Sequence, residues 1–267
     1  MNIPNDRLSN RDYWDRILAE ANLPRRNSQR DYNYLVTMDY VNSFIADNKY
    51  KTLLEVGCGS SGWLPYFAAR YNLIVSGLDY SEVGCGICEK NLRMQGIVFG
   101  KIFCRDLFDE NCTDNEKYDV VFTYGVIEHF EDPGKVISRL THLVNPGGLI
   151  ISHVPNLNGL MGLMSRSFVR EIHLMHRVVT REQLCNWHIE RGLINLRTDY
   201  AGIFSLSVIP WVRSKTWFFL EKSFQRKVCL KLITIVESFL GKVFMRFLGK
   251  FTSKTFSPYI ISICRKK

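Results

Sequence analysis

A glycine-rich loop between a predicted strand and a predicted helix constrains the fold of this chain most. Residues 53–62 read LLEVGCGSSG, which gives Gly57, Gly59 and Gly62 a Gly-x-Gly-x-x-Gly spacing. Glycine lets the backbone turn sharply and lets a ligand lie directly on it, where a Cβ atom would clash. In an open parallel sheet such a loop lies at the carboxyl edge, where ligands bind. The loop therefore predicts an α/β fold with a ligand site at the end of the first strand.

Short apolar runs alternate with helical patterns along most of the chain. We expect strands over 53–56, 73–78, 97–104, 119–124, 149–154, 194–198 and 258–264. We expect helices over 62–71, 81–95, 133–144 and 180–191, the last with a capping box between Thr180 and Gln183. This order predicts a doubly wound, mostly parallel, seven-stranded Rossmann-like sheet with helices on both faces.

The positive charge of the chain is concentrated near its C-terminal end. The formal net charge is +9, but residues 213–267 carry a net +11 and residues 1–212 a net −2. We therefore expect no nucleic-acid binding by the main domain. Apolar residues at helical spacing between 217 and 247 indicate a basic amphipathic segment. That stripe could cover the domain itself, pair with a second subunit in a homodimer, or lie on an anionic membrane surface.

Targeting and redox signals are absent from the sequence. No stretch approaches the ~18 apolar residues of a spanning helix, and the first ten residues lack a signal-peptide pattern. The eight cysteines follow no disulfide-framework spacing. We expect a cytoplasmic protein, with membrane association through residues 213–252 as the alternative.

Acidic residues around the loop indicate what the ligand is. Asp79 ends the second predicted strand, where a carboxylate can accept both ribose hydroxyls of an adenosine. Glu55 stands two residues before the first glycine, where it would repel a pyrophosphate but attract an ammonium group. Asp106 and Leu107 follow the third strand and can meet the adenine edge. A nicotinamide dinucleotide site shares the glycine spacing and stays open as an alternative.

The segments LEVGCGSSG, GLDYS, CRDLFD, YDVVFTYGVIEHFEDP and LVNPGGLIISHVPN occur in this order. Together they resemble the class I S-adenosylmethionine-dependent methyltransferases, the broad group that includes quinone-precursor and natural-product enzymes. The resemblance implies a methyltransferase domain over 49–202 plus 256–267. Residues 1–48 are then expected to form an N-terminal helical cap, and 203–255 a helical insertion before the last strand.

The resemblance also implies a set of cofactor contacts. The methionine part of S-adenosylmethionine would lie on the glycine loop, its ribose on Asp79, and its sulfonium end near the fourth strand. The implied residues are Glu55, Gly57, Gly59, Gly62, Asp79, Tyr80, Asp106, Leu107, Tyr124 and Gly125.

The catalytic candidates are His129, after the fourth strand, and His153, near the end of the fifth. Either imidazole could take a proton from a hydroxyl acceptor. Some relatives bind a divalent metal through Glu-x-x-Glu-His, but residues 125–129 read GVIEH and lack the first acid. We therefore predict no metal.

These observations predict methyl transfer from S-adenosylmethionine to a small or lipid-like acceptor, at oxygen rather than nitrogen or carbon. Two alternatives are an oxidoreductase that uses a nicotinamide dinucleotide and a non-catalytic protein that binds S-adenosylmethionine.

Overall fold

A seven-stranded sheet forms the centre of the protein, in a computed structural model that describes residues 6–27, 32–46, 49–202, 235, 236, 239, 243 and 252–267. Its strand order is β3-β2-β1-β4-β5-β7-β6. The strands are β1 (Thr52–Val56), β2 (Ile74–Asp79), β3 (Ile102–Cys104), β4 (Tyr118–Tyr124), β5 (Val144–Pro155), β6 (Leu193–Ala201) and β7 (Tyr259–Lys266). The first five pair in parallel, and β7 runs antiparallel to both β5 and β6. The predicted mostly parallel, seven-stranded fold is confirmed.

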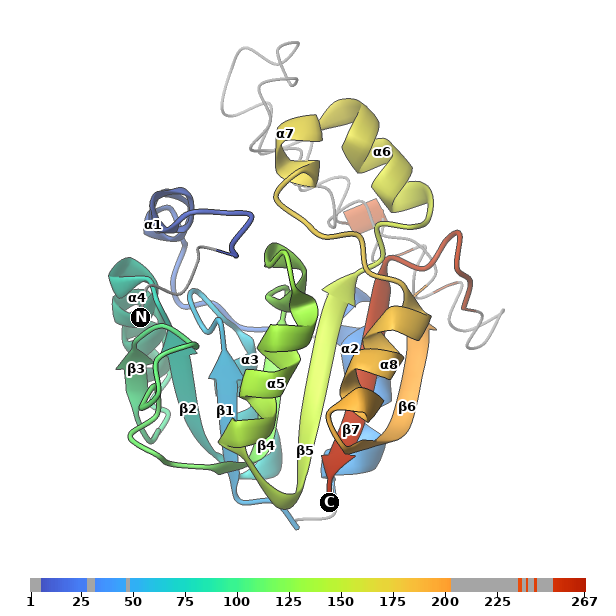
Figure 1. Ribbon diagram of the computed structural model, residues 1–267. Coiled ribbons are helices and arrows are strands. Elements are labelled where there is room, and N and C mark those ends of the chain that lie inside the picture. Colours follow the sequence, from blue (N-terminus) through green and yellow to red (C-terminus); the bar gives the residue numbers. More distant parts are fainter. Residues whose placement is uncertain are drawn as a thin grey trace.

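Helices cover both faces of this sheet (Figure 1). The elements α2 (Tyr32–Ile45), α3 (Trp63–Tyr71) and α4 (Glu82–Met94) share one buried core with one side of the strands. On the opposite face lie α5 (Pro133–Leu143) and α8 (Arg181–Glu190). The predicted capping box of α8 is present, because the side chains of Thr180 and Gln183 each accept a backbone N–H of the other residue.

The two cores explain why the strand sequences are apolar without alternation. Leu53 and Leu54 are adjacent in β1 and both fully buried, yet Leu53 belongs to one core and Leu54 to the other. Successive strand side chains point to opposite faces, so a sheet covered on both sides buries neighbouring residues of its central strands alike.

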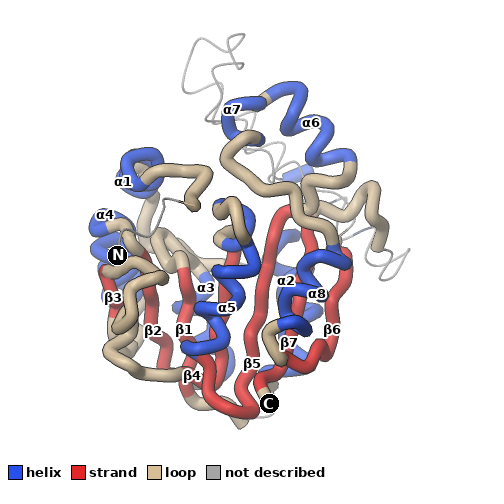
Figure 2. The backbone as a smooth tube through the Cα atoms, in the orientation of Figure 1, coloured by secondary structure: helices blue, strands red, loops and turns tan. Residues whose placement is uncertain are grey.

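Several short elements lie beyond the carboxyl ends of the parallel strands, with α1 on the β2 side and α6 and α7 on the β5 side (Figures 1 and 2). They are α1 (Arg11–Ala19), the 3₁₀ helix η1 (Ile127–His129), α6 (Leu160–Phe168) and α7 (Arg170–His173). The chain before α1 is tied to the residues that end η1. The N–H of Leu8 donates to the His129 carbonyl at 2.9 Å, and the N–H of Glu131 donates to the Asp6 carbonyl at 2.7 Å. We call residues 6–9 the strap.

The predicted basic amphipathic segment, 213–252, lies outside the described residues except for Ile235, Val236, Phe239, Val243 and Thr252. Among the residues that the structure does describe, no helix combines the length and the apolar character that crossing a membrane requires.

Candidate active site

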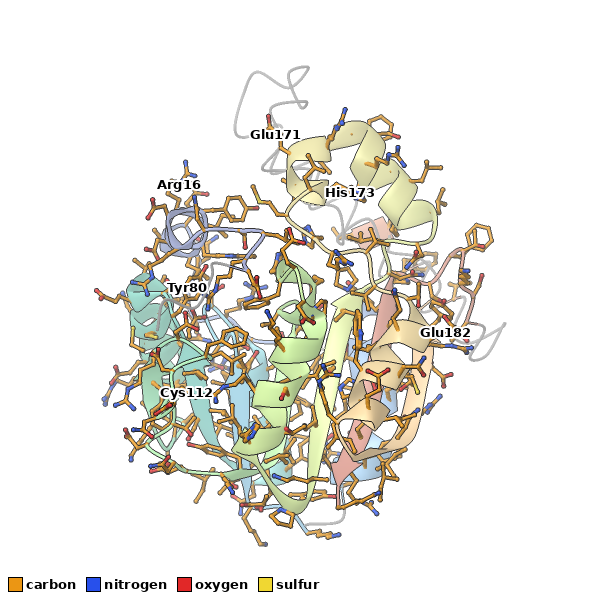
Figure 3. The ribbon with its side chains drawn as sticks, viewed as in Figure 1. Arg16, Tyr80, Cys112, Glu171, His173 and Glu182 are labelled. Atoms are coloured by element: carbon orange, nitrogen blue, oxygen red, sulfur yellow. The ribbon has the colours of Figure 1, made fainter. Side chains whose placement is uncertain are left out.

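A cavity of about 490 Å³ opens at the carboxyl edge, between the glycine loop, α1 and the end of β4. It is lined by nine of the ten predicted cofactor contacts, namely Glu55, Gly57, Gly59, Gly62, Asp79, Tyr80, Leu107, Tyr124 and Gly125. These residues come from four strand ends, and the parallel topology brings them together. Figure 3 shows Tyr80 at this edge, close to α1.

The backbone of the glycine loop is held against neighbouring elements. Gly57 has a φ of +78°, and a Cβ atom at this position would lie 2.5 Å from Cγ2 of Val126. The N–H of Gly57 donates to the Leu78 carbonyl at 2.8 Å. A side chain is therefore excluded both by the left-handed backbone and by the close approach of the residue before η1.

Asp79 connects the loop to the next strand. Its Oδ2 accepts the N–H of Gly59 at 2.9 Å, and its Oδ1 accepts the N–H of Ser81 at the same distance. Burial raises the pKa of this carboxyl group although both hydrogen bonds act in the opposite direction. Each carboxylate oxygen keeps a second lone pair, so the fixed side chain can still accept two hydroxyl groups from a ligand.

Glu55 is a buried carboxyl group with one oxygen unused. Only 2% of the residue is exposed, and Oε1 accepts the Ser61 hydroxyl at 2.8 Å. Oε2 has no hydrogen-bond partner among the described residues. Burial raises the pKa of Glu55 to about 8, against the opposing hydrogen bond from Ser61. A cationic ligand group would supply the partner that the protein itself does not provide.

The strap and α1 line one side of the cavity with residues that were not among the predicted cofactor contacts. Arg7, Ser9, Trp14 and Leu18 line the cavity from this side. The Arg7 guanidinium lies 4.8 Å from the centre of the Tyr80 ring. It donates to Oδ1 of Asp106 at 2.7 Å.

Asp106 is therefore placed differently from the other predicted contacts. Its Oδ1 also accepts the N–H of Phe108 at 2.9 Å, and the residue does not line the cavity, whereas the adjacent Leu107 does. No local pattern could have indicated this, because Arg7 is 99 residues away along the chain.

The two catalytic candidates lie in different surroundings. His129 lines the cavity, its ring packs edge-on against Trp14 with centroids 5.0 Å apart, and its Nδ1 lies 2.8 Å from the Met175 carbonyl. His153 does not line the cavity; it stacks on the lining residue Tyr124 with centroids 4.1 Å apart. Burial lowers the pKa of each imidazole to about 3, so both are neutral near pH 7.

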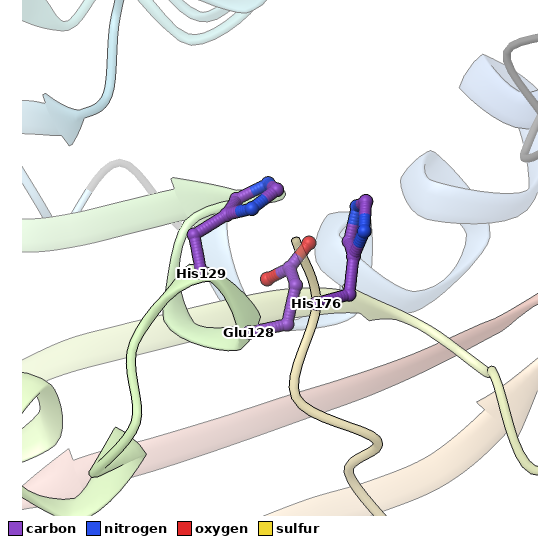
Figure 4. A group of neighbouring side chains, drawn as sticks. All are labelled: Glu128, His129 and His176. Carbon is purple, nitrogen blue, oxygen red and sulfur yellow. The ribbon is translucent and has the colours of Figure 1, made fainter. Parts of the chain in front are cut away.

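Beside His129 the fold brings together a group that the sequence did not predict. One ligand atom from each of Glu128, His129 and His176 lies within 4.8 Å of the others. His176 belongs to the connection between α7 and α8, 47 residues beyond His129. Figure 4 shows the Glu128 carboxylate between the two imidazole rings.

Comparisons with known proteins agree with this architecture. A ubiquinone biosynthesis O-methyltransferase from Aeromonas salmonicida is 26% identical over 162 residues, which cover 57% of this chain and 66% of the relative. The enzyme of the same name from Serratia proteamaculans is 31% identical over 116 residues, which cover 43% of this chain and 47% of the relative. The chain thus spans between about half and two thirds of the length of the curated relatives it matches.

Solved structures share the fold at low sequence identity. Phosphoethanolamine N-methyltransferase 2 from Haemonchus contortus, solved with S-adenosyl-L-methionine, has a TM-score of 0.55 at 15% identity, over 86% of this chain and 51% of its own. The cyclase SpnF has a TM-score of 0.56 at 17% identity, over 86% and 79%. These likenesses show the fold alone, which supports more than one chemistry.

The family described as "Methyltransferase domain" matches residues 26–198, from the segment before α2 to within β6. This range contains every predicted cofactor contact and both catalytic candidates. Because the match covers more than half of the sequence, the chain belongs to the methyltransferase-domain family, within the class I S-adenosylmethionine-dependent methyltransferase superfamily.

Proposed function

We propose that this protein transfers a methyl group from S-adenosylmethionine to an oxygen atom of a small or lipid-like acceptor. The observation that carries the proposal is Oε2 of Glu55, a buried oxygen in the cavity lining that has no hydrogen-bond partner among the residues the structure describes. The named relatives, ubiquinone biosynthesis O-methyltransferases, support oxygen as the accepting atom. Neither the family match nor these relatives support the nicotinamide alternative.

The residues present fit the cofactor. Glu55 would bind the ammonium group of its methionine part, and the two oxygens of Asp79 would accept the ribose hydroxyls. The glycine loop would lie along the ligand, since a Cβ atom at Gly57 is already excluded by Val126. When bound, S-adenosylmethionine supplies an electrophilic methyl group on a sulfonium centre, so the protein contributes chiefly position and charge.

Besides positioning the cofactor, the protein must remove the proton of the acceptor hydroxyl. His129 is the catalytic candidate that reaches the cavity. The carbonyl of Met175 can only accept a hydrogen bond, so Nδ1 of His129 carries the ring proton and Nε2 keeps a lone pair. That lone pair can accept the hydroxyl proton as the oxygen–methyl bond forms, because the proton is then far more acidic than in the free acceptor and a base of pKa about 3 suffices. The strap and Trp14 cover the same region and would exclude bulk water.

Titration calorimetry with S-adenosylhomocysteine tests the cofactor assignment, with NAD as the control ligand. We expect binding of S-adenosylhomocysteine alone; binding of NAD instead would overturn the assignment of Glu55 and of the enzyme class. Transfer of a radiolabelled methyl group to phenol and catechol acceptors, compared with amines of similar size, then tests the accepting atom. Product formed only from the amines would contradict transfer to oxygen.

The charge of residues 213–252 supports a lipid-like acceptor. We propose that this segment holds the enzyme on an anionic membrane surface, with a second copy of the chain as the alternative partner. Each basic residue near such a surface contributes roughly 1 kcal/mol to binding. Replacing Lys222, Arg226 and Lys227 by Gln should therefore weaken binding to anionic vesicles about 100-fold. Unchanged binding to these vesicles, or no binding by the wild-type protein, would contradict the membrane proposal.

A further inference from the structure

The group formed by Glu128, His129 and His176 is held together by the backbone. The N–H of Arg177 donates to the Glu128 carbonyl at 2.6 Å, while the Met175 carbonyl faces Nδ1 of His129 at 2.8 Å. These two contacts lie on either side of His176 and hold the connection between α7 and α8 against η1. The His176 side chain therefore lies beside Glu128 and His129 because hydrogen bonds on both sides of it position its backbone.

Both imidazoles have one ring nitrogen committed to a carbonyl group. Nδ1 of His129 faces the Met175 carbonyl, and Nδ1 of His176 lies 2.7 Å from the Ile172 carbonyl. A carbonyl oxygen only accepts, so each Nδ1 carries its proton and each Nε2 keeps an unshared lone pair. Metal-binding histidines are oriented in this way, with the second ring nitrogen donating to a backbone carbonyl.

Glu128 has an unused acceptor in the same place. The residue is 1% exposed, and its Oε2 has no hydrogen-bond partner within the described part of the chain. Among the described residues, no lysine or arginine forms an ion pair with this carboxyl group. A buried carboxylate oxygen without a donor is unfavourable unless a cation or a proton compensates it.

We propose that Glu128, His129 and His176 bind a divalent transition-metal ion such as Zn²⁺. Two imidazole nitrogens and one carboxylate oxygen form a ligand set of catalytic zinc sites, which leave a fourth position open. Mg²⁺ and Ca²⁺ instead require ligands that are nearly all oxygen. A tetrahedral zinc ion with bonds of ~2.1 Å holds its ligand atoms ~3.4 Å apart. The candidate ligand atoms of the three residues now lie up to 4.8 Å apart, so they must approach one another for such an ion to bind.

This inference departs from the sequence-based prediction of no metal. That prediction depended on Gly125, which stands where Glu-x-x-Glu-His has its first acid. The fold places a histidine from a distant connection beside the remaining Glu-His pair, and no local spacing could show this.

A cation at this position would act on the acceptor side of the cavity, because His129 lines the cavity. It would lower the pKa of a hydroxyl group bound beside it. This role rests on the proposed transfer to oxygen, whereas metal binding itself does not. The ion would also occupy the Nε2 lone pair of His129, so the two roles of that residue exclude each other.

The test is titration of the chelator-treated full chain with Co²⁺, without cofactor or acceptor, followed by visible absorption. We expect one Co²⁺ per chain, with d–d bands and no near-ultraviolet thiolate charge-transfer band, although the chain has eight cysteines. Glu128→Gln and His176→Ala should each weaken binding by at least about tenfold. His142→Ala is the matched control, because this exposed histidine also has its Nδ1 on a carbonyl of its own helix.

Circular dichroism and the unfolding midpoint establish that each variant is folded, and the isosteric Glu128→Gln keeps the test valid if His176→Ala does not fold. The proposal is overturned by no binding to the wild-type chain, by a thiolate band, or by affinities that neither variant changes. Measuring turnover of His176→Ala distinguishes a failure of the metal proposal from a failure of the proposed function. If His129 acts alone as the base, His176→Ala retains full turnover; if the ion is required, metal and turnover are lost together.

Discussion

The buried carboxyl group of Glu55 should make the cofactor-free protein less stable as the pH rises. Its pKa is raised from 4.5 to about 8, so between these values the unfolded chain releases a proton that the folded chain retains. Stability then falls with increasing pH, because the folded state binds more protons. At ~1.4 kcal/mol per pKa unit, the loss is about 3 kcal/mol at pH 7 and on the order of 5 kcal/mol above pH 8.

Glu55→Gln isolates this contribution, since glutamine has the same shape, stays neutral and can still accept the Ser61 hydroxyl. The unfolding free energy of the variant should exceed that of the wild type by about 1 kcal/mol at pH 5 and by about 3 kcal/mol at pH 7. Urea denaturation at pH 5, 6, 7 and 8 measures the difference. Burial also raises the pKa of Glu128 to about 8, so only the difference between the two proteins reports on Glu55. A difference that does not grow with pH would refute the reasoning.

Cofactor binding should remove the same proton. An ammonium group beside Glu55 favours the ionised carboxylate, so at pH 7 the wild type should release close to one proton per bound S-adenosylmethionine. Calorimetry in buffers of different ionisation enthalpy measures this number. Glu55→Gln should release none and bind roughly 10- to 100-fold more weakly, as expected for one charged hydrogen bond. Exposed Glu110 provides the control, because Glu110→Gln should match the wild type.

Three further predictions concern the same site. Asp79→Asn should weaken S-adenosylhomocysteine binding by roughly 10- to 100-fold in calorimetry, whereas Asp109→Asn, at an exposed position, should not. His129→Ala should lower turnover by ~10²–10⁴ with unchanged S-adenosylhomocysteine affinity, and full turnover would make this histidine structural. Gly57→Ala should destabilise the fold by more than Gly96→Ala in urea denaturation. Both positions have positive φ and share a strain of ~1–2 kcal/mol, but only at Gly57 does a Cβ atom meet a neighbour, at 2.5 Å.

The predicted site residues that line the cavity are those placed by local chain geometry. The glycine loop and Asp79 lie at strand ends, and a parallel sheet brings its strand ends to one edge whatever the helices between them contain. The weakest strand boundary is that of β3, expected from residue 97 but paired with β2 only from Ile102. This short edge strand has one neighbour, so its pairing depends on the path of the preceding loop.

The parts that sequence missed depend on contacts between distant segments. Arg7 meets Asp106 across 99 residues, and His176 reaches His129 only because the connection before α8 pairs with η1. Neither contact changes the composition or periodicity of the segments involved. His153 shows the opposite case: its position at the end of a strand resembles that of a site residue, but its ring stacks on Tyr124, and of the two only Tyr124 lines the cavity.

The position of β7 has a consequence for synthesis of the protein. This strand lies between β5 and β6, although 57 residues separate it from β6 along the chain. While the ribosome is still translating those residues, β5 and β6 have no strand to join them, and each exposes unpaired backbone groups. Strands β1 to β4, whose ends hold the glycine loop and Asp79, have already been synthesised and can pair at that time. A nascent chain stalled before residue 259 would therefore be able to form most of the cofactor cavity while remaining prone to aggregation along two open edges.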